Sequence, residues 1–296
     1  GIIICILYNF YVFARFTKFW RSNKLAPSQE YSRDIKVISV NVYQYNKAFH
    51  RFIAMIRTEQ PDIFLTMESN MDWENAIASL ADEYPYSENI ALENTYGMHF
   101  YTKFKIKNLK VHYFVSDDLP SIEAELETAD GYKFVFFGVH PPPPRPTEEE
   151  TSKERDGDLL SVAKQAKKTN LPVLITGDFN TVAWSRESIL FKKSSGLIDA
   201  RYGRGYLATF HTKYWFFRIP LDLLYHSTSI FIKDLKILPS IGSDHFPISC
   251  VFYIDKYNDD QEEEVKTLDS DEKQEVDELI EEGQDEESEN RDREGA

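Results

Sequence analysis

The chain has 296 residues, a formal net charge of -15 and 42% hydrophobic residues, which suits one large domain with extensions rather than two full domains. All of the excess charge lies in residues 255–296, which hold 20 acidic and 5 basic residues, so the preceding part is electrically balanced. The two cysteines, Cys5 and Cys250, both lie in apolar runs. This count argues against a disulfide framework and a cysteine metal site.

An apolar run at residues 2–13 is followed by four basic residues, Arg15, Lys18, Arg21 and Lys24. A complete membrane span needs about 20 apolar residues, but a basic flank is typical of the ends of membrane helices. We therefore interpret residues 1–20 as the end of a truncated transmembrane anchor helix and residues 21–34 as a linker. This predicts a membrane-anchored protein, on a side of the membrane that the sequence leaves open. The alternative is an amphipathic helix that packs on the domain.

From residue 35 onward, strand patterns alternate with helical stripes of apolar residues. We predict helices at 47–60, around 73–80 and at 151–168. The predicted strands are 35–40, 62–67, 97–102, 122–128, 132–139, 172–176, 221–226, 230–238 and 248–254. Asp130 and Gly131 mark a hairpin between two of them. This order indicates an α/β sandwich with helices outside and two sheets inside.

The acidic segment 255–296 has few aliphatic residues and a single aromatic residue, Tyr257. Such a composition cannot bury enough apolar surface to offset the entropy lost on ordering. We therefore predict an acidic disordered tail, at most transiently helical, that solubilises the protein and repels nucleic acid.

Polar residues suited to metal and phosphate binding occur at the ends of successive predicted strands. They are Asn41, Glu68, His140, Asp178, Asn180, Asp222, Asp244 and His245. Functional residues are commonly carried by loops at strand ends, and acids, an amide and a histidine can hold a hard divalent cation and activate a water. Taken singly, most have a structural alternative, because Asp and Asn also form turns. Together they predict hydrolysis of a phosphate ester.

Six short motifs accompany these residues in a fixed order. They are SVNV at 39–42, MES at 67–69, GVH at 138–140, GDFN at 177–180, PLD at 220–222 and SDH at 243–245. The set resembles the endonuclease/exonuclease/phosphatase superfamily, which comprises metal-dependent phosphoesterases. The resemblance implies a deoxyribonuclease-I-like, four-layer α/β/β/α sandwich over residues 35–254. HPPPP at 140–144 and GSDHFPI at 242–248 further resemble an uncharacterised bacterial branch that is membrane-anchored through N-terminal helices.

The resemblance also implies a role for each strand-end residue. The expected metal ligands are Asn41, Glu68 and Asp244, and the expected catalytic residues are His140, Asp178, Asn180, Asp222, Asp244 and His245. Asp178 would orient or deprotonate the attacking water, while Asn180 and His140 would bind the phosphate. Asp222 would fix the ring of His245, which would stabilise the charge of the transition state.

Two positions depart from the family's pattern. Tyr43 stands where many nucleases of the superfamily carry a second metal-binding Asp, so we expect one Mg²⁺ or Mn²⁺ ion rather than two. Leu223 follows Asp222 where the bacterial branch has a histidine. We expect that change to affect substrate contacts more than the core chemistry.

The substrate stays open at this stage. A phosphodiester, cleaved in an endonuclease-like or phosphodiesterase reaction, is the first hypothesis. The alternatives are a membrane-associated phosphatase or phospholipase acting on a lipid headgroup or small phosphorylated metabolite, and a catalytically weak phosphate-binding module. Nucleic-acid binding would need a basic surface, and the best candidates are Lys192, Lys193, Arg201, Arg204, Lys213 and Arg218. We expect a monomer.

Overall fold

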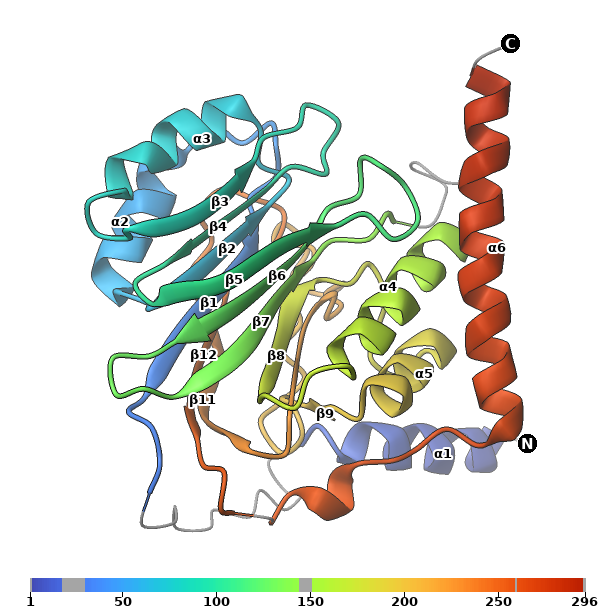
Figure 1. Ribbon diagram of the computed structural model, residues 1–296. Coiled ribbons are helices and arrows are strands. Elements are labelled where there is room, and N and C mark those ends of the chain that lie inside the picture. Colours follow the sequence, from blue (N-terminus) through green and yellow to red (C-terminus); the bar gives the residue numbers. More distant parts are fainter. Residues whose placement is uncertain (1, 18–29, 144–150, 259, 295–296) are drawn as a thin grey trace.

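The computed structural model describes residues 2–17, 30–143, 151–258 and 260–294. Two six-stranded mixed sheets pack face to face and carry helices on their outer faces, which confirms the predicted four-layer α/β/β/α sandwich (Figure 1). Most of the predicted linker 21–34, like Pro144, lies outside the described residues.

The first sheet has the strand order β11-β12-β1-β2-β4-β3. Its strands are β1 (Ile35–Asn41), β2 (Ile63–Met67), β3 (Tyr86–Ile90), β4 (Met98–Thr102), β11 (Ile230–Ile237) and β12 (Ile248–Ile254). Its outer face is covered by α2 (Phe49–Glu59), α3 (Met71–Ile77) and the short 3-10 helix η1 (Ala78–Leu80). Phe52 and Trp73 of these helices pack edge to face, 5.8 Å apart between ring centroids, and close the outer core of this side.

The second sheet has the strand order β5-β6-β7-β8-β10-β9. Its strands are β5 (Lys105–His112), β6 (Ser121–Glu127), β7 (Lys133–Val139), β8 (Val173–Asp178), β9 (Ile198–Asp199) and β10 (Asp222–His226). The predicted hairpin joins β6 to β7, with Gly131 at φ 83° in its turn. α4 (Lys153–Ala166) and α5 (Arg186–Ser195) cover the outer face.

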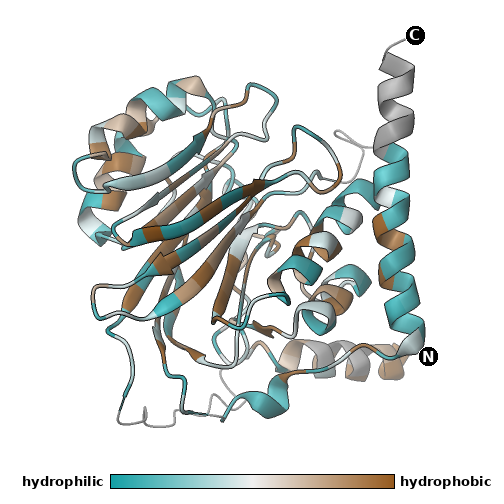
Figure 2. Ribbon diagram, viewed as in Figure 1, coloured by the Kyte–Doolittle hydropathy of each residue, from teal (hydrophilic) through white to brown (hydrophobic). Residues whose placement is uncertain are grey.

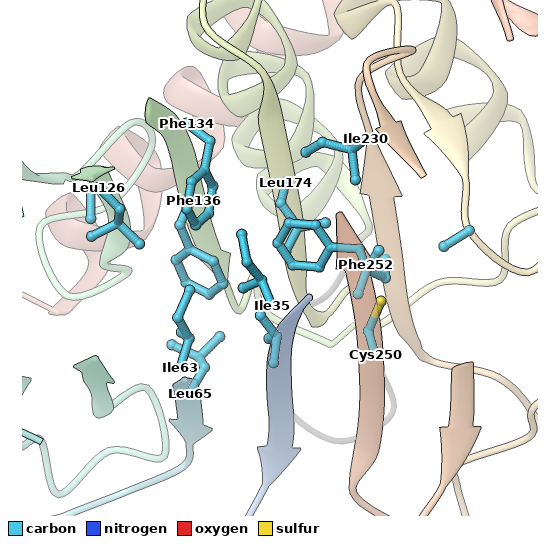
Figure 3. Packing of buried hydrophobic residues seen from close by; sticks show 14 of the residues in the cluster. Ile35, Ile63, Leu65, Leu126, Phe134, Phe136, Leu174, Ile230, Cys250 and Phe252 are labelled. Carbon is cyan, nitrogen blue, oxygen red and sulfur yellow. The ribbon is translucent and has the colours of Figure 1, made fainter. Parts of the chain in front are cut away.

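The strands alternate apolar residues between two cores, because successive side chains point to opposite faces of a sheet. Phe134 and Phe136 of β7 point into the core between the sheets, whereas Val135 and Phe137 point toward the helices. Figure 3 shows the inter-sheet core, where Phe136 and Leu174 from one sheet face Leu65 from the other. Burial on both faces explains why these strands read as nearly continuous apolar runs.

The acidic C-terminal segment contains a 25-residue helix, α6 (Ser270–Glu294), which follows a short 3-10 helix, η2 (Glu262–Glu264). α6 lies along α4 and α5 (Figure 1). Val276 is only 1% exposed and joins the outer core with Leu279 and Ile280. The prediction of a disordered tail is therefore wrong for residues 270–294. The helix is largely hydrophilic (Figure 2), but a sparse stripe of apolar residues on it packs against the outer core.

Charge pairs and a close backbone contact hold α6 in place. Lys193 on α5 donates to both carboxylate oxygens of Glu272, at 2.5 and 2.7 Å, and Arg186 reaches Glu275 through Nε at 3.0 Å. Gly157 of α4 and Gly283 of α6 face each other so closely that a Cβ added to Gly157 would lie 3.2 Å from the Gly283 Cα. α6 thus forms an additional layer on the second sheet's side.

The apolar N-terminal run forms a 13-residue helix, α1 (Ile2–Ala14). Phe13 contacts Trp184, with ring centroids 5.0 Å apart, and Phe16 packs near Tyr202 at 5.5 Å. Among the described residues, no helix combines the length and the hydropathy that a membrane span requires. This finding corrects the prediction of a membrane-anchored location. The contacts of Phe13 and Phe16 correspond instead to the alternative of a helix that packs on the domain.

Replacing Val276 with Asp is expected to undock α6, since a charge would enter the apolar contact with α4. The loss of apolar burial and the cost of burying the charge together should make docking of α6 less favourable by about 2–4 kcal/mol. Limited proteolysis should then cleave within residues 270–286 faster than in the parent protein. The exposed Glu278→Ala should behave like the parent, and equal protection of Val276→Asp would contradict the docked arrangement.

Candidate active site

The topology brings the strand-end polar residues of both sheets to one edge of the sandwich. β1 and β2 are parallel, so Asn41 and Glu68 emerge together. β7 and β8 are also parallel, and they place His140 beside Asp178. β10 runs antiparallel to β8, with Asp222 opposite Asp178.

The segment before β12 completes this edge. β12 runs antiparallel to β1, with Ile248 opposite Ser39, so Asp244 and His245 lie at the same end of the first sheet as Asn41. The eight residues selected from the sequence therefore all lie at one edge. Their individual roles are not tested by this placement and stay predictions.

Asn41 links the carboxylates of the two sheets. Its Nδ2 donates to Glu68 Oε1 at 2.7 Å and to Asp178 Oδ2 at 3.2 Å, while its Oδ1 accepts the Tyr43 N–H at 3.0 Å. Burial, aided by the nearby Asp244 and Asp178, raises the pKa of Glu68 to about 7 against the lowering effects of the Asn41 hydrogen bond and the His245 charge. Several acids thus share one partly dehydrated space, a setting that a divalent cation would relieve.

His245 lies between two buried aspartates. Its Nδ1 is 2.7 Å from Asp222 Oδ2, and its Nε2 is 3.5 Å from Asp178 Oδ2. Burial alone would lower the pKa of the imidazole, but Asp222 and Asp178 outweigh burial and raise it to about 10. His245 is therefore a cation at neutral pH, held by Asp222 with its other nitrogen directed toward Asp178.

Asp178 connects the remaining residues of the edge. Its Oδ1 accepts the Asn180 N–H at 3.0 Å, and Asn180 Nδ2 donates to the Pro141 carbonyl at 2.9 Å, which ties the GDFN turn to the chain beyond His140. Burial lowers the pKa of His140 to about 4, so its ring is neutral at neutral pH. Its Nδ1 is buried and has no hydrogen-bond partner among the described residues.

The backbone is strained at this edge. Glu68, Asn180 and Tyr43 all have positive φ angles, of 54°, 49° and 59°, a conformation that L-residues adopt at a cost and that clusters at functional sites. Gly177 precedes Asp178, and a Cβ on it would lie 1.8 Å from the Val139 carbonyl oxygen. A residue without a side chain is therefore required where β8 passes β7.

Two groupings of these residues offer themselves to a divalent cation. Asp178, Asp222 and His245 have ligand atoms within 4.8 Å of one another. Because His245 is protonated and its Nδ1 is committed to Asp222, we regard this cluster as a charge network rather than a ligand set. Glu68 and Asp244 supply oxygen atoms in a space with excess negative charge, which fits the preference of Mg²⁺ and Mn²⁺.

Two residues outside the predicted set of site residues support the site. Ser243 Oγ donates to the Asn41 carbonyl at 2.7 Å and accepts the His245 N–H at 3.0 Å, so it fastens one strand end to the other. Arg155 on α4 is buried and donates to the Asn180 carbonyl at 3.2 Å and to Asp156 at 2.8 Å. The polar sequence around Arg155 signals a helix surface, and only the fold reveals its contact with Asn180.

The predicted basic cluster does not form one phosphate-binding surface. Lys193 pairs with Glu272, Arg201 is buried against Asp199, and Arg204 donates to backbone carbonyls. Leu223 also corrects an expectation, since it lies fully buried in the helix-side core, on the opposite face of β10 from Asp222. A residue at position 223 therefore cannot contact a substrate beside Asp222.

Buried carboxylates, an amide and a histidine cation at the edge of a four-layer sandwich define a metal-dependent phosphoesterase. The chain belongs to the Endonuclease/Exonuclease/phosphatase family, whose family model matches residues 38–245. The resemblance seen in the sequence is thereby confirmed. No curated protein matches the chain.

Solved structures show the same fold. D. rerio TDP2 complexed with a single-strand DNA product is similar with a TM-score of 0.64 at 16% identity, covering 75% of this chain and 99% of that one. An endonuclease/exonuclease/phosphatase family protein from Bacteroides thetaiotaomicron is similar with a TM-score of 0.63 at 20% identity, covering 77% of this chain and 98% of that one. A mannosyl-6-phosphatase from the same organism is similar with a TM-score of 0.57 at 20% identity, covering 74% of this chain and 99% of that one.

Metal affinity is expected to fall as the pH drops below 7. Glu68 must lose its proton to bind a cation, and its pKa of about 7 in the metal-free protein makes proton and metal compete. The affinity for Mn²⁺, measured by calorimetry, should decrease about tenfold per pH unit below that pKa. Glu68→Gln should weaken binding and flatten this dependence, whereas the exposed Glu83→Gln should not. An unchanged profile in Glu68→Gln would contradict the role of Glu68.

Replacing Arg155 with Met is expected to displace the Asn180 turn, because the buried guanidinium would no longer hold the Asn180 carbonyl. Arg155 also donates to Glu187 at 3.3 Å, and leaving Asp156 and Glu187 without this partner should destabilise the fold by about 3 kcal/mol. Turnover of a chromogenic phosphate ester should fall about tenfold, even at temperatures where the variant is fully folded. Arg155→Lys should not restore turnover, and the exposed Lys167→Met should change neither quantity. Normal turnover in folded Arg155→Met would refute the positioning role.

Proposed function

We propose that the protein hydrolyses a phosphodiester by attack of a water activated beside Asp178. The observation that carries this proposal is the continuous line of contacts from Asp222 through His245 to Asp178, and onward through Asn41 to Glu68. This line joins a cation, an acceptor for a water proton and a metal-binding carboxylate. Water activation and charge stabilisation are the two requirements of phosphate-ester hydrolysis.

Each residue of the line has a distinct role in the proposal. Asp178 accepts the hydrogen bond of the attacking water and orients it. His245 stabilises the negative charge that develops on the phosphate oxygens, and Asp222 keeps its ring charged and correctly turned. Asn180 and the neutral ring of His140 bind the remaining oxygens. Asn41 orients Glu68 and Asp178, since its amide nitrogen faces both carboxylates.

Glu68 and Asp244 would hold a single Mg²⁺ or Mn²⁺ ion. Asn41 would add its amide oxygen only after turning its amide over, since that oxygen accepts the Tyr43 N–H here. Such an ion, when bound, neutralises phosphate charge and lowers the pKa of a coordinated water. The expectation of one ion follows from Tyr43, which supplies no carboxylate at the position where a second acid would stand. Tyr43 is partly exposed and packs its ring against Tyr45 instead, with 5.6 Å between centroids.

Two similar structures are named for different phosphate-bearing substances, a single-strand DNA product and a mannosyl-6-phosphate. They leave the substrate of this chain open. The electrically balanced catalytic region and the internal pairing of Lys193, Arg201 and Arg204 disfavour a long polyanion such as duplex DNA. We therefore favour a compact phosphodiester. A catalytically weak phosphate-binding module has less support, because the acid–histidine–acid network is intact.

Hydrolysis of bis(p-nitrophenyl) phosphate with Mn²⁺ tests this proposal. His245→Ala should lower kcat by about a hundredfold to ten-thousandfold, because an isolated charge at the transition state would be lost. Glu68→Ala should reduce activity at limiting metal concentrations, and a chelator should abolish it. His50→Ala removes an exposed histidine of α2 and serves as the matched control. No hydrolysis by the parent protein, or full activity in both site variants, would sink the proposal.

The pH dependence of the same reaction examines the role of Asp222. Since the aspartates raise the pKa of His245 to about 10, the rate at saturating Mn²⁺ should stay level just above pH 7 and fall as the pH rises toward 10. Asp222→Asn keeps an acceptor of similar shape but removes the negative charge, so the pKa of His245 falls. The alkaline decline should then begin at lower pH. An unshifted decline would show that His245 does not act as the cation.

A further inference from the structure

A short loop beside the catalytic histidine exposes an unusual run of aromatic side chains. We define the aromatic loop as residues 211–218, between β9 and β10. Tyr214, Trp215, Phe216 and Phe217 are 49, 82, 73 and 58% exposed. Contiguous exposed apolar groups of this size are rare on proteins that meet only water, and they mark interaction sites.

The base of the aromatic loop is fixed to the site. Phe210 and Ile219 form an antiparallel bridge that closes the loop, and Phe210 also bridges to His245. Thr212 donates its N–H to the Asp244 carbonyl and its hydroxyl to the Ser243 carbonyl, both at 2.8 Å. Whatever contacts the exposed aromatic side chains is therefore held next to Asp244 and His245.

The orientations of the rings distinguish between two possible binding partners, single-stranded nucleic acid and a lipid surface. Single-stranded nucleic acid stacks its bases on the flat faces of aromatic rings. The rings here are tilted against one another, by 57° between Tyr214 and Phe216 and by 85° between Trp215 and Phe216. They offer no shared stacking plane. Diverging rings suit an apolar medium without fixed orientation, such as the acyl region of a lipid surface, where Trp and Tyr are enriched.

The charges flanking the aromatic side chains agree with a lipid surface. Lys213 and Arg218 are both exposed, and Arg218 lies over the Phe246 ring with its guanidinium carbon 4.8 Å from the centroid. Two cations around an apolar tip match a layer of phosphates above acyl chains. Most of the other basic residues in this part of the chain pair internally, so the site offers little to a long polyanion.

Building on the phosphodiesterase function proposed above, we propose that the aromatic loop inserts into a phospholipid surface and that the substrate is a phosphodiester presented there. Insertion of Trp215, Phe216 and Phe217 would bring the lipid phosphates level with Lys213 and Arg218. The bonds of Thr212 to the Ser243 and Asp244 carbonyls then set the depth at which Asp244 and His245 meet a headgroup. This contact is made by a loop and requires no membrane-spanning segment.

Vesicle flotation with the whole chain tests binding separately from catalysis. The protein should float with phosphatidylcholine vesicles that contain one-fifth phosphatidylglycerol. The triple variant Trp215→Ala, Phe216→Ala, Phe217→Ala should lower the bound fraction by about tenfold or more. Tyr257→Ala is the matched control, because Tyr257 is also 74% exposed but lies beyond the far end of β12 from His245. A second control, Ile3→Ser with Leu7→Ser, removes exposed apolar side chains of α1 and should still float.

Tryptophan fluorescence reports on the loop itself. Vesicles should shift the emission of the parent protein to shorter wavelength, and Trp215→Phe should abolish this shift while preserving flotation. Failure of the parent protein to float, or equal flotation of the triple variant, would overturn the inference. So would a response of Trp215 to single-stranded oligothymidine but not to vesicles, which would indicate base stacking.

Hydrolysis of the soluble bis(p-nitrophenyl) phosphate separates failure of this inference from failure of the proposed function. The triple variant should hydrolyse that substrate at the rate of the parent protein, since the aromatic side chains do not touch the reacting atoms. Normal hydrolysis without vesicle binding would refute the lipid surface alone. Vesicle binding without hydrolysis would refute the proposed function and leave the loop's affinity established.

Discussion

The site depends on one arrangement, the face-to-face packing of two sheets whose strand ends meet at one edge and pair with each other. The hydrogen bond between His245 and Asp222 crosses from the first sheet's side to the second, as does the bond from Asn41 to Asp178. Each sheet supplies acids, an amide and a histidine, but the two closest partnerships, His245 with Asp222 and Asn41 with Asp178, each need one residue from either sheet. The apolar core between the sheets therefore sets the distances on which charge stabilisation depends, and catalytic geometry and folding share the same packing.

Buried apolar runs were enough to locate most central strands, because a strand covered on both faces has a distinctive sequence. β3 and β5 escaped notice, since they lie at sheet edges and consist largely of polar and charged residues. α6 was misjudged for a different reason. Its residues are poor in apolar groups, and the partners that stabilise it, such as Lys193 and Gly157, lie far away in the chain.

In the site, too, local sequence motifs identified some residues, whereas contacts between distant parts of the chain could not be predicted. Motif order brought Glu68, Asp178 and His245 into one hypothesis, because each lies at the end of a recognisable strand. Sequence alone did not reveal that Arg155 reaches the Asn180 carbonyl from a helix, or that the side chain of Leu223 points away from Asp222. Those facts depend on which face of an element meets its neighbour, and strand alternation fixes that only when the covering elements are known.

The contact between Gly157 and Gly283 bears on how so acidic a helix finds a single position. Ion pairs between flexible side chains are individually weak and can be exchanged for others one turn away, so charge alone would allow α6 to slide along α4. Backbones can approach this closely only where both helices lack a side chain. The glycine pair therefore fixes the position of α6 along α4. Opposite charges and the apolar contacts of Val276, Leu279 and Ile280 hold α6 against the domain, whereas the close approach of the two glycines sets its register.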